Sequence, residues 1–427
     1  MMKIMPVDEF RPQDFKTPPI QAGNEIEEKV DAIIAAVREK GDRALMEFAE
    51  KFDHASLSSV LVSDAELDEA FSACDPDFLE TLTRARDNIE NFHKHQVRSS
   101  FVVSEENGKV MGQRIIPLKR VGLYVPGGTA AYPSSVLMNA VPPKLAGVKE
   151  IIIATPPGRD GKVNPAILCA AKIAGVTKII KAGGAQAIAA LAYGTESVPP
   201  VDKIVGPGNV FVATAKRRVY GIVDIDMIAG PSEILVLADG RSNPAFVAAD
   251  LLSQAEHDKL ASAILVTDSE ALAKAVQAEV EKQVETLPRR DIARVSIDNN
   301  GKIIVAHSLD QGVEIANLIA PEHLEICVDE PFAFLPRIES AGSVFLGRNV
   351  PEALGDYWAG PNHTLPTSGT ARFSSPLSVD DFVKKSQFLY YSTDALREAK
   401  DNIVSFACRE GLNGHANSVA IRFGETV

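Results

Sequence analysis

The sequence predicts an α/β protein built from two doubly wound parallel sheets, with a helical N-terminal segment and a C-terminal helical arm. Short apolar strands alternate with helices from about Val148 onward, and a second alternation of the same kind begins at Ile234. Two successive series of βαβαβ units form two parallel sheets with a cleft between them. The length of 427 residues also favours more than one hydrophobic core.

The first hundred residues are predicted to be mostly helical. Apolar residues recur there at helical spacing, at Ile26, Val30, Ile33, Ile34 and Val37. Gly41 is a stop signal for this helix, and a second, strongly charged helix follows over about residues 77–95. Residues 99–120 then have strand character around Asn107-Gly108, the strongest short hairpin signal.

Two series of strands and helices follow. The first has strands at 151–154, 178–180 and 203–205 and helices at 165–175, 185–193 and 210–219. The second has strands at 234–237, 263–266, 302–305, 324–328 and 343–346 and helices from 244, at 269–286 and at 310–319. We therefore expect an N-terminal arm (1–24), a first α/β domain in two pieces (25–120 and 234–376), a second α/β domain (121–233) and a C-terminal helical arm (377–427).

Composition narrows the class of protein. Hydrophobic residues make up 45% and charged residues 24%, which is ordinary for a soluble globular protein. The net charge of −13 argues against a nucleic-acid or anionic-membrane partner, and no apolar run approaches the ~20 residues of a membrane helix. The N-terminus has no apolar core like that of a signal peptide. The four cysteines are far apart and form no Cys-x-x-Cys pair, so we expect reduced thiols in a cytoplasmic protein.

The most informative stretch is the segment 355–366, which holds Asp356 and His363 in a run broken by Gly and Pro. Such a run excludes a regular helix or a central strand. A turn-rich loop alone would explain the Gly and Pro. Histidine stands beside a carboxylate or an amide in three further segments, however, at 254–257, 321–324 and 410–415. Together the four segments predict a metal site with an acid–base pair.

The metal-ligand set is taken from these segments. Gln254 and His257 are three residues apart at a helix end, so both side chains project from one face. Alone, His257 could equally cap the last carbonyls of that helix. With Asp356 and His415 the set contains two imidazoles, a carboxylate and an amide oxygen, which suits Zn²⁺ and also Mn²⁺ or Co²⁺. The absence of thiolates disfavours a purely structural zinc site.

Glu322 and His323 form the predicted acid–base pair. They stand where Pro321 separates a helix from a strand, a junction from which adjacent side chains can both enter a cleft. A carboxylate can activate water, and an imidazole can take a proton near neutral pH. An ordinary surface pair is the alternative.

Glycine-rich turns follow several predicted strands, at 124–128, 183–186 and 206–209. Helix N-termini after glycines favour phosphates. The start Gly206-Pro-Gly208 lacks the third glycine of the dinucleotide fingerprint, because Phe211 occupies that place. This is therefore not the usual dinucleotide fingerprint, and the glycines leave open a dinucleotide bound in an atypical way. The two doubly wound sheets are predicted to be incomplete Rossmann-like ones.

Seven of these motifs together resemble the histidinol dehydrogenase family. They are Val121-Gly-Leu-Tyr-Val-Pro-Gly-Gly, Gly183-Gly-Ala-Gln-Ala-Ile-Ala-Ala, Val205-Gly-Pro-Gly-Asn, Ala229-Gly-Pro-Ser-Glu, Leu252-Ser-Gln-Ala-Glu-His, Gly355-Asp-Tyr and Asn362-His-Thr-Leu-Pro-Thr. The resemblance implies oxidation of L-histidinol via L-histidinal to L-histidine with two NAD⁺, the last step of histidine biosynthesis. It also implies one zinc per active site and a homodimer, in which the C-terminal arm reaches the partner subunit.

The resemblance assigns a role to each matching residue. The zinc ligands would be Gln254, His257, Asp356 and His415, and the catalytic pair would be Glu322 and His323. The substrate would contact Ser232, Glu410, His323 and the four metal ligands. NAD would contact Tyr124, Gln186 and Asn209. His363 matches a family histidine near the substrate.

Three other functions were weighed. An enzyme that traps an aldehyde on a Cys thiolate is disfavoured, because Cys169 and Cys327 lie in apolar elements. A related dehydrogenase of another small polyol or amino alcohol is closer to the sequence pattern. A two-lobed solute-binding protein would have a similar architecture, but the missing export signal and the Glu322–His323 pair count against it.

Overall fold

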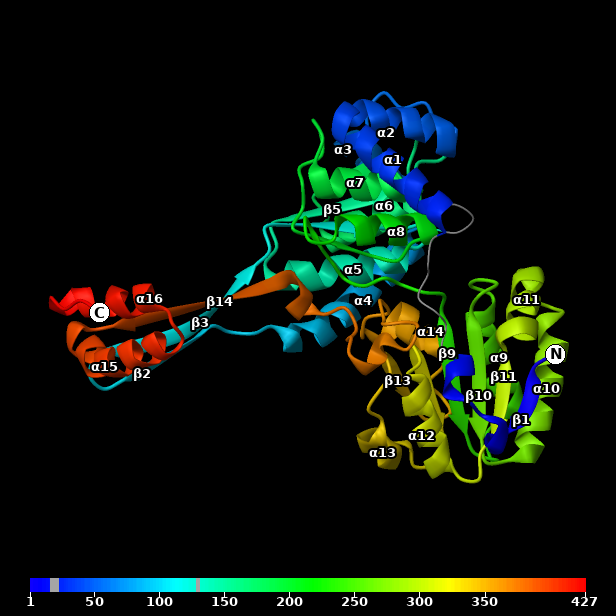
Figure 1. The fold of residues 1–427 in the computed structure, drawn as a ribbon. Coiled ribbons are helices and arrows are strands. Elements are labelled where there is room, and N and C mark those ends of the chain that lie inside the picture. Colours follow the sequence, from blue (N-terminus) through cyan, green and yellow to red (C-terminus); the bar gives the residue numbers. More distant parts are fainter. Residues whose placement is uncertain (16–22, 128–130) are drawn as a thin grey trace. The chain divides into compact units, whose positions relative to one another are not determined.

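The computed structural model describes residues 1–15, 23–127 and 131–427 (Figure 1). Gly128 and residues 16–22 of the predicted N-terminal arm lie outside the described residues. The chain forms two compact units, whose relative positions the structure does not fix. The first unit contains Met1–Gln96 and Leu118–Phe382, and the second contains Val97–Pro117 and Val383–Val427.

The first unit contains two parallel sheets, as the sequence predicts. One has the order β1-β11-β10-β9-β12-β13 and the other the order β6-β5-β4-β7-β8, with every neighbouring pair parallel. The strands of the first sheet are β1 (Lys3–Pro6), β9 (Glu233–Ala238), β10 (Ser262–Thr267), β11 (Lys302–Val305), β12 (His323–Cys327) and β13 (Ser343–Leu346). Those of the second are β4 (Arg120–Tyr124), β5 (Glu150–Thr155), β6 (Lys178–Lys181), β7 (Lys203–Val205) and β8 (Asp224–Ile225).

Both sheets share one winding pattern. If β1 is set aside, each begins with a central strand, adds two strands on one side and then two on the other. This is the Rossmann order without its last strand, so the predicted incomplete Rossmann-like fold is confirmed. The order in which strands are added changes direction beside β9 in the first sheet and beside β4 in the second. These two switch points frame the sites described below.

Helices cover both faces of each sheet, because successive strand residues point to opposite sides (Figure 1). In the first sheet, Val236 and Leu265 pack against α9 (Pro244–Ala255), α10 (Glu270–Val284) and α11 (Arg290–Asn300). Leu235 and Val266 face α12 (Leu309–Ile319). In the second sheet, Ile153 packs with α5 (Pro133–Ala146) and α6 (Pro165–Ala174), whereas Ile152 packs with α7 (Gly184–Tyr193) and α8 (Val210–Val219).

The N-terminal helices correct the predicted domain division. The sequence assigned residues 25–120 to the domain of the first sheet. In the structure, α1 (Asn24–Lys40), α2 (Asp42–Phe48), α3 (Asp64–Ala73) and α4 (Pro76–His93) pack on helices of the second sheet instead. Val30, Ile34 and Val37 join the core around Ile188. Helical periodicity shows that a face is buried, but not which surface buries it, and this explains the error.

The N-terminal arm also contains a strand that was not predicted. β1 pairs with β11 at the edge of the first sheet, from Lys3↔Lys302 to Pro6↔Val305. A strand of four residues is too short to give a clear alternation of polar and apolar residues.

The second unit is a three-stranded antiparallel sheet with two helices. Its strands are β2 (Phe101–Glu105), β3 (Lys109–Pro117) and β14 (Val383–Tyr391), and its helices are α15 (Thr393–Arg409) and α16 (Asn413–Ala420). The predicted hairpin at Asn107-Gly108 is confirmed, with positive φ angles of 71° and 79° at the two turn residues. Of the predicted helical arm (377–427), residues 377–382 belong to the first unit. The remainder begins with the strand β14, whose partner β3 is distant in the sequence.

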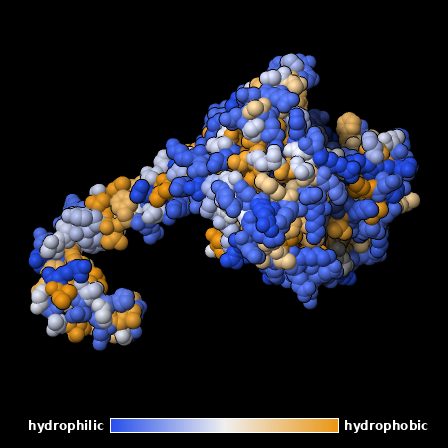
Figure 2. All heavy atoms as spheres, turned by 90° about the horizontal axis from the view of Figure 1, so that it is seen from above, coloured by the Kyte–Doolittle hydropathy of each residue, from blue (hydrophilic) through white to orange (hydrophobic). Residues whose placement is uncertain are grey.

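Apolar side chains are exposed on this second unit, where orange atoms lie among blue ones in Figure 2. They include Val102, Leu389, Tyr390 and Phe406. Among the helices that the structure describes, none has both the length and the apolar character needed to cross a bilayer.

Candidate active site

The predicted catalytic pair lies at the amino end of β12, beside the amino end of β9. Glu322 accepts the N–H of Glu233 at 2.9 Å, and Nδ1 of His323 lies 2.9 Å from the Glu233 carbonyl oxygen. A carbonyl can only accept, so Nδ1 carries the proton and Nε2 holds the lone pair. The first residue of β9 therefore holds both side chains of the predicted pair and selects the tautomer of the imidazole.

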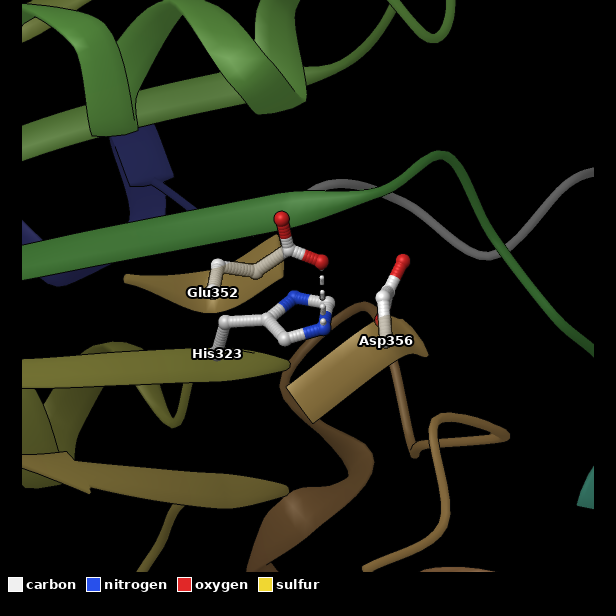
Figure 3. Close-up of side chains that lie close together, drawn as sticks. All are labelled: His323, Glu352 and Asp356. Carbon is white, nitrogen blue, oxygen red and sulfur yellow. Dashed lines mark ion pairs between the residues drawn. The ribbon is translucent and has the colours of Figure 1, made fainter. Parts of the chain in front are cut away.

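Two carboxylates face this imidazole from one short segment. Glu352 lies in α14 (Glu352–Leu354), and Asp356 lies one turn later in the π-helical turn Gly355–Ala359. Oε1 of Glu352 is 3.7 Å from Nε2 of His323 (Figure 3). Ligand atoms of His323, Glu352 and Asp356 all lie within 4.8 Å of one another, close enough to bind one metal ion.

Several buried polar atoms here have no hydrogen-bond partner among the described residues. They are both side-chain polar atoms of Gln254, Nε2 of His323 and Oε1 of Glu352. Gln254 is in the last turn of α9 and is 1% exposed. It lies close to Glu352, but without the geometry of a hydrogen bond. Because buried polar groups are normally satisfied, such a cluster is typical of a binding site.

Burial and neighbouring charges raise some pKa values in the site and lower others. Burial raises the pKa of Glu322 well above its usual range and lowers the pKa of His323. Burial and the charge of Asp356 raise the pKa of Glu352 to about 9. Burial also acts to raise the pKa of Asp356, but hydrogen bonding to His363 and the charges of His363 and His323 outweigh it, so that this pKa is lowered. The site thus favours an ionised Asp356 and disfavours the charged forms of Glu322, Glu352 and His323.

The site opens into a cavity of about 120 Å³ within the first unit. His323, Asp356 and His363 line it together with apolar residues such as Phe345 and Leu365. Nδ1 of His363 lies 3.6 Å from Oδ1 of Asp356. The lining of the cavity therefore combines imidazole and carboxylate groups with apolar side chains.

The glycine-rich turns gather at the carboxyl ends of β4, β6 and β7 in the second sheet. Tyr124 ends β4, and its hydroxyl accepts the N–H of Gly184 at 3.1 Å, at the start of α7. Gln186 is buried in the first turn of α7. The side chain of Asn209 caps α8 by accepting the N–H groups of Phe211 and Val212.

Gly206 has to be glycine. Its φ is 112°, and a Cβ there would lie 2.2 Å from the carbonyl oxygen of Tyr124. The Gly206 N–H donates to Asp226 at 2.7 Å, and its carbonyl accepts from buried Lys216 at 3.0 Å. A buried ion pair between Lys216 and Asp226 thus anchors this turn.

Comparison with known proteins gives one consistent result. A family model described as histidinol dehydrogenase matches residues 17–423. The histidinol dehydrogenase of Clostridium acetobutylicum is 59% identical over 399 residues, which cover 93% of each chain. That of Listeria monocytogenes serotype 4b is 56% identical over 401 residues, which cover 94% of each chain. The crystal structure of histidinol dehydrogenase from Elizabethkingia anophelis has a TM-score of 0.93 at 38% identity, covering 99% of this chain and 97% of that one.

The chain belongs to the histidinol dehydrogenase family. The resemblance drawn from the sequence motifs is therefore confirmed, and the family name places the chain among the oxidoreductases of histidine biosynthesis.

The residues predicted to bind metal or substrate or to act in catalysis fall into three groups in this histidinol dehydrogenase family member. Glu322, His323, Asp356, His363 and Gln254 lie together as described above. Ser232 directly precedes Glu233 at the start of β9, and His257 is exposed in the turn after α9, where Asp356 influences its pKa. Glu410 and His415 belong to the second unit, so the structure does not place them relative to these residues.

Glu352 was missed from the sequence. It is 2% exposed and lies against His323. The available signal was its spacing of four residues before Asp356, which puts two carboxyl groups on one helical face. Without the structure, nothing distinguished it from the many surface glutamates of an acidic protein.

Proposed function

We propose that the protein is a zinc- and NAD-dependent L-histidinol dehydrogenase that converts L-histidinol via L-histidinal to L-histidine, the last step of histidine biosynthesis, in the cytoplasm. The observation that carries the proposal is the convergence of unpartnered buried atoms of Gln254, His323 and Glu352 beside an ionised Asp356. The names of close relatives support the substrate, and four free cysteines suit a reducing compartment.

The donor set fits a zinc ion. We propose Gln254, His257 and Asp356 as ligands, with His415 as the fourth. The unpartnered amide of Gln254 and the ionised Asp356 are the oxygen donors that such a site requires. When bound, zinc would orient the amino and imidazole nitrogens of the substrate. Mn²⁺ and Co²⁺ suit the same donors, and metal substitution decides between them.

His323 is the proposed base of the first oxidation. Its Nε2 has the free lone pair and takes the hydroxyl proton of L-histidinol. The C–H bond breaks with its electron pair, a hydride leaves to NAD⁺, and a C=O bond forms. The lowered pKa of His323 keeps the ring neutral and able to accept a proton. The Glu233 carbonyl then stabilises the imidazolium through its bond to Nδ1.

Glu322 is the proposed base of the second oxidation. In its ionised form, the Glu322 carboxylate takes one proton from a water molecule, whose oxygen adds to the carbonyl carbon of L-histidinal. His323 releases its first proton to solvent. The hydrate then loses its C–H hydride to a second NAD⁺ as its remaining O–H proton passes to Nε2 of His323, which gives the carboxylate. The raised pKa of Glu322, caused by burial, makes this carboxylate a stronger base than an exposed one.

The glycine-rich turns of the second sheet are the proposed NAD site. Tyr124, Gln186 and Asn209 would contact the cofactor there. The starts of α7 and α8 present backbone N–H groups that suit a pyrophosphate. A Cβ on Gly183 would lie 2.8 Å from the Pro156 side chain, so the backbone can come this close only without one. NAD supplies the hydride acceptor in both oxidations.

We further propose a homodimer in which the C-terminal arm completes the partner's site. Exposed apolar side chains on the second unit, such as Leu389 and Phe406, need a covering surface. Glu410 and His415 are also exposed within their own chain, as ligands supplied to a partner would be. In this arrangement Glu410 would contact the substrate of the partner subunit.

A catalytic thiolate is not part of this proposal. Burial raises the pKa of Cys169 to about 12, and burial together with Glu325 and Asp250 raises that of Cys327 further. Neither thiol would form the thiolate that attacks an aldehyde.

The deciding experiment follows NADH absorbance after L-histidinol and NAD⁺ are added to the purified, zinc-loaded protein. We expect two NADH per L-histidinol consumed, and L-histidine as the product. Other amino alcohols and small polyols, tested in parallel, should react far more slowly. A solute-binding protein would give no NADH at all, and a faster reaction with another alcohol would reassign the substrate.

A further inference from the structure

A second set of carboxyl groups lies next to the candidate site. Glu325 follows His323 by two residues on β12, so both side chains point to the same face of the strand. Asp250 precedes Gln254 by four residues on α9, so it lies one turn away on the same face of that helix. On β12 the acidic residue Glu325 thus lies on the same face as His323, and on α9 the acidic residue Asp250 lies on the same face as Gln254.

Glu325 connects these elements to a third one. It is completely buried, and its Oε1 accepts the N–H of Glu352 at 2.8 Å. On α9, the carboxyl of Asp250 lies close enough to this carboxyl for each group to change the pKa of the other. Cys327, which shares its face of β12, packs in the core formed by α9. One carboxyl group thus ties β12 to α9 and to the segment that starts at Glu352.

Each of these three segments carries a proposed functional residue. His323 is on β12, Gln254 is on α9, and Asp356 lies one turn after Glu352. We propose that Glu325 is a positioning residue, which sets the relative positions of these three side chains through its bonds to Asp250 and to the backbone of Glu352. The functional roles rest on the function proposed above, whereas the connection itself does not.

Glu325 acts as a neutral acid in this arrangement. Burial, and then the charge of Asp250, raise its pKa to about 9. A protonated carboxyl can donate its O–H to Asp250 while its other oxygen accepts the N–H of Glu352. A glutamine amide offers the same donor and acceptor in nearly the same shape. Methionine fills the space but offers neither.

The test therefore compares Glu325→Gln with Glu325→Met. The Met variant should bind zinc 10- to 100-fold more weakly and lose activity by a similar factor, the range typical of groups that support metal ligands. The Gln variant should stay within about threefold of the wild type. The KM for NAD⁺ should change in neither, because the NAD turns lie on the other sheet. Leu324→Met, on the opposite face of β12, is the matched control and should behave as wild type.

Two further measurements separate positioning from simple stability. Replacing a buried polar group by an apolar one of similar size is often neutral for stability, so the Met variant should melt within a few degrees of the wild type. In the metal-free protein, the nitrogen-bound ring proton of His323 should shift in the NMR spectrum of Glu325→Met and stay in place in Glu325→Gln. This signal needs neither zinc nor histidinol. It therefore tests the connection even if the wild type fails to oxidise L-histidinol, a failure that would reject the proposed function alone.

Two outcomes would overturn the inference. Wild-type zinc affinity and ring signal in Glu325→Met would show that the connection positions nothing. Equal losses in Glu325→Gln and Glu325→Met would show that the charge of Glu325 matters and the hydrogen bonds do not. If Glu325→Met fails to fold, Asp250→Asn against Asp250→Leu repeats the comparison from the other partner, with the same expected pattern.

Discussion

The two parallel sheets of the first unit have the same winding order, but their candidate sites lie at opposite ends of the strands. In the second sheet, the glycine-rich turns lie at the carboxyl ends of the strands, the usual place for ligands in open α/β sheets. In the first sheet, Glu322 and His323 lie at the amino ends. The winding order alone therefore does not decide whether a site lies at the amino or the carboxyl ends of the strands.

The charge of the expected ligand explains the difference. The helices α7 and α8 begin at the carboxyl ends of the strands of the second sheet. Helix N-termini favour anions such as a pyrophosphate. At the amino ends of the strands of the first sheet, α9 ends beside Gln254, and α12 ends shortly before Pro321. Helix C-termini favour cations, such as a metal ion or the protonated amine of an amino alcohol. One sheet thus suits the cofactor, and the other suits the metal and the substrate.

Metal removal should give the largest effect. Treatment with a chelator should abolish turnover and leave the far-UV circular dichroism spectrum nearly unchanged, because the apolar cores on the two faces of the first sheet include none of the proposed ligands. NAD⁺ binding should survive, since its turns lie on the other sheet. Readdition of zinc should restore activity. Loss of the folded spectrum, or of NAD⁺ binding, would contradict this separation of the two sites.

The next largest effect should come from the catalytic pair. His323→Asn should slow oxidation of L-histidinol by roughly 10²- to 10⁴-fold, and Glu322→Gln should slow mainly the oxidation of L-histidinal by a similar factor. Separate assays with the alcohol and the aldehyde measure the two steps. Both variants should bind NAD⁺ as the wild type does. Near wild-type rates on both substrates would remove these residues from the mechanism.

Mixed dimers test whether the first-sheet site needs the second unit of a partner. Subunits with His415→Ala and subunits with His323→Asn should each be inactive alone. After mixing in equal amounts, roughly half the dimers are mixed, and one of their two sites carries neither defect, so activity should approach about a quarter of the wild type. No recovery, under conditions in which subunits demonstrably exchange, would mean that each site is built from one chain.

A glycine substitution should affect the second sheet alone. Gly206→Ala forces a Cβ against the carbonyl of Tyr124 in a backbone conformation that favours glycine. Strain of this kind costs about 1–3 kcal/mol, so we expect the KM for NAD⁺ to rise about tenfold or more. Zinc affinity, measured by competition with a chelator, should stay unchanged. Gly221→Ala is the matched control, since Gly221 also has a positive φ but no atom near the position of a Cβ.

The alternation of strands and helices was predictable because it is a local property of the chain. The Asn107-Gly108 hairpin and the Asn243 cap of α9 were also visible in sequence, since each depends on residues within a few positions. The strands β1 and β14 were not, because each depends on a partner strand that is far away in the chain. The packing partner of α1 was wrong for the same reason.

The residues of the candidate site also differ in whether local sequence or distant packing identifies them. Glu322, His323 and Asp356 stand out in sequence because of their neighbours, Pro321 in one case and the glycines around Asp356 in the other. Glu352 and Glu325 lie in ordinary sequence surroundings, and only their burial distinguishes them. Burial of an acid follows from packing between distant segments, which periodicity does not reveal.

The smallest predicted effect concerns the pH dependence of stability. Burial, and then the charge of Asp250, raise the pKa of Glu325 from 4.5 to about 9. Between these values the folded state holds a proton that the unfolded state releases, so unfolding becomes easier as the pH rises. The contribution is fully present below pH 4.5 and is lost as the pH passes through about 9. Glutamine cannot titrate, so the melting temperature of Glu325→Gln should fall less steeply over this interval than that of the wild type. Melting curves of both metal-free proteins across the interval measure the two slopes, and equal slopes would mean that Glu325 is ionised in the folded protein.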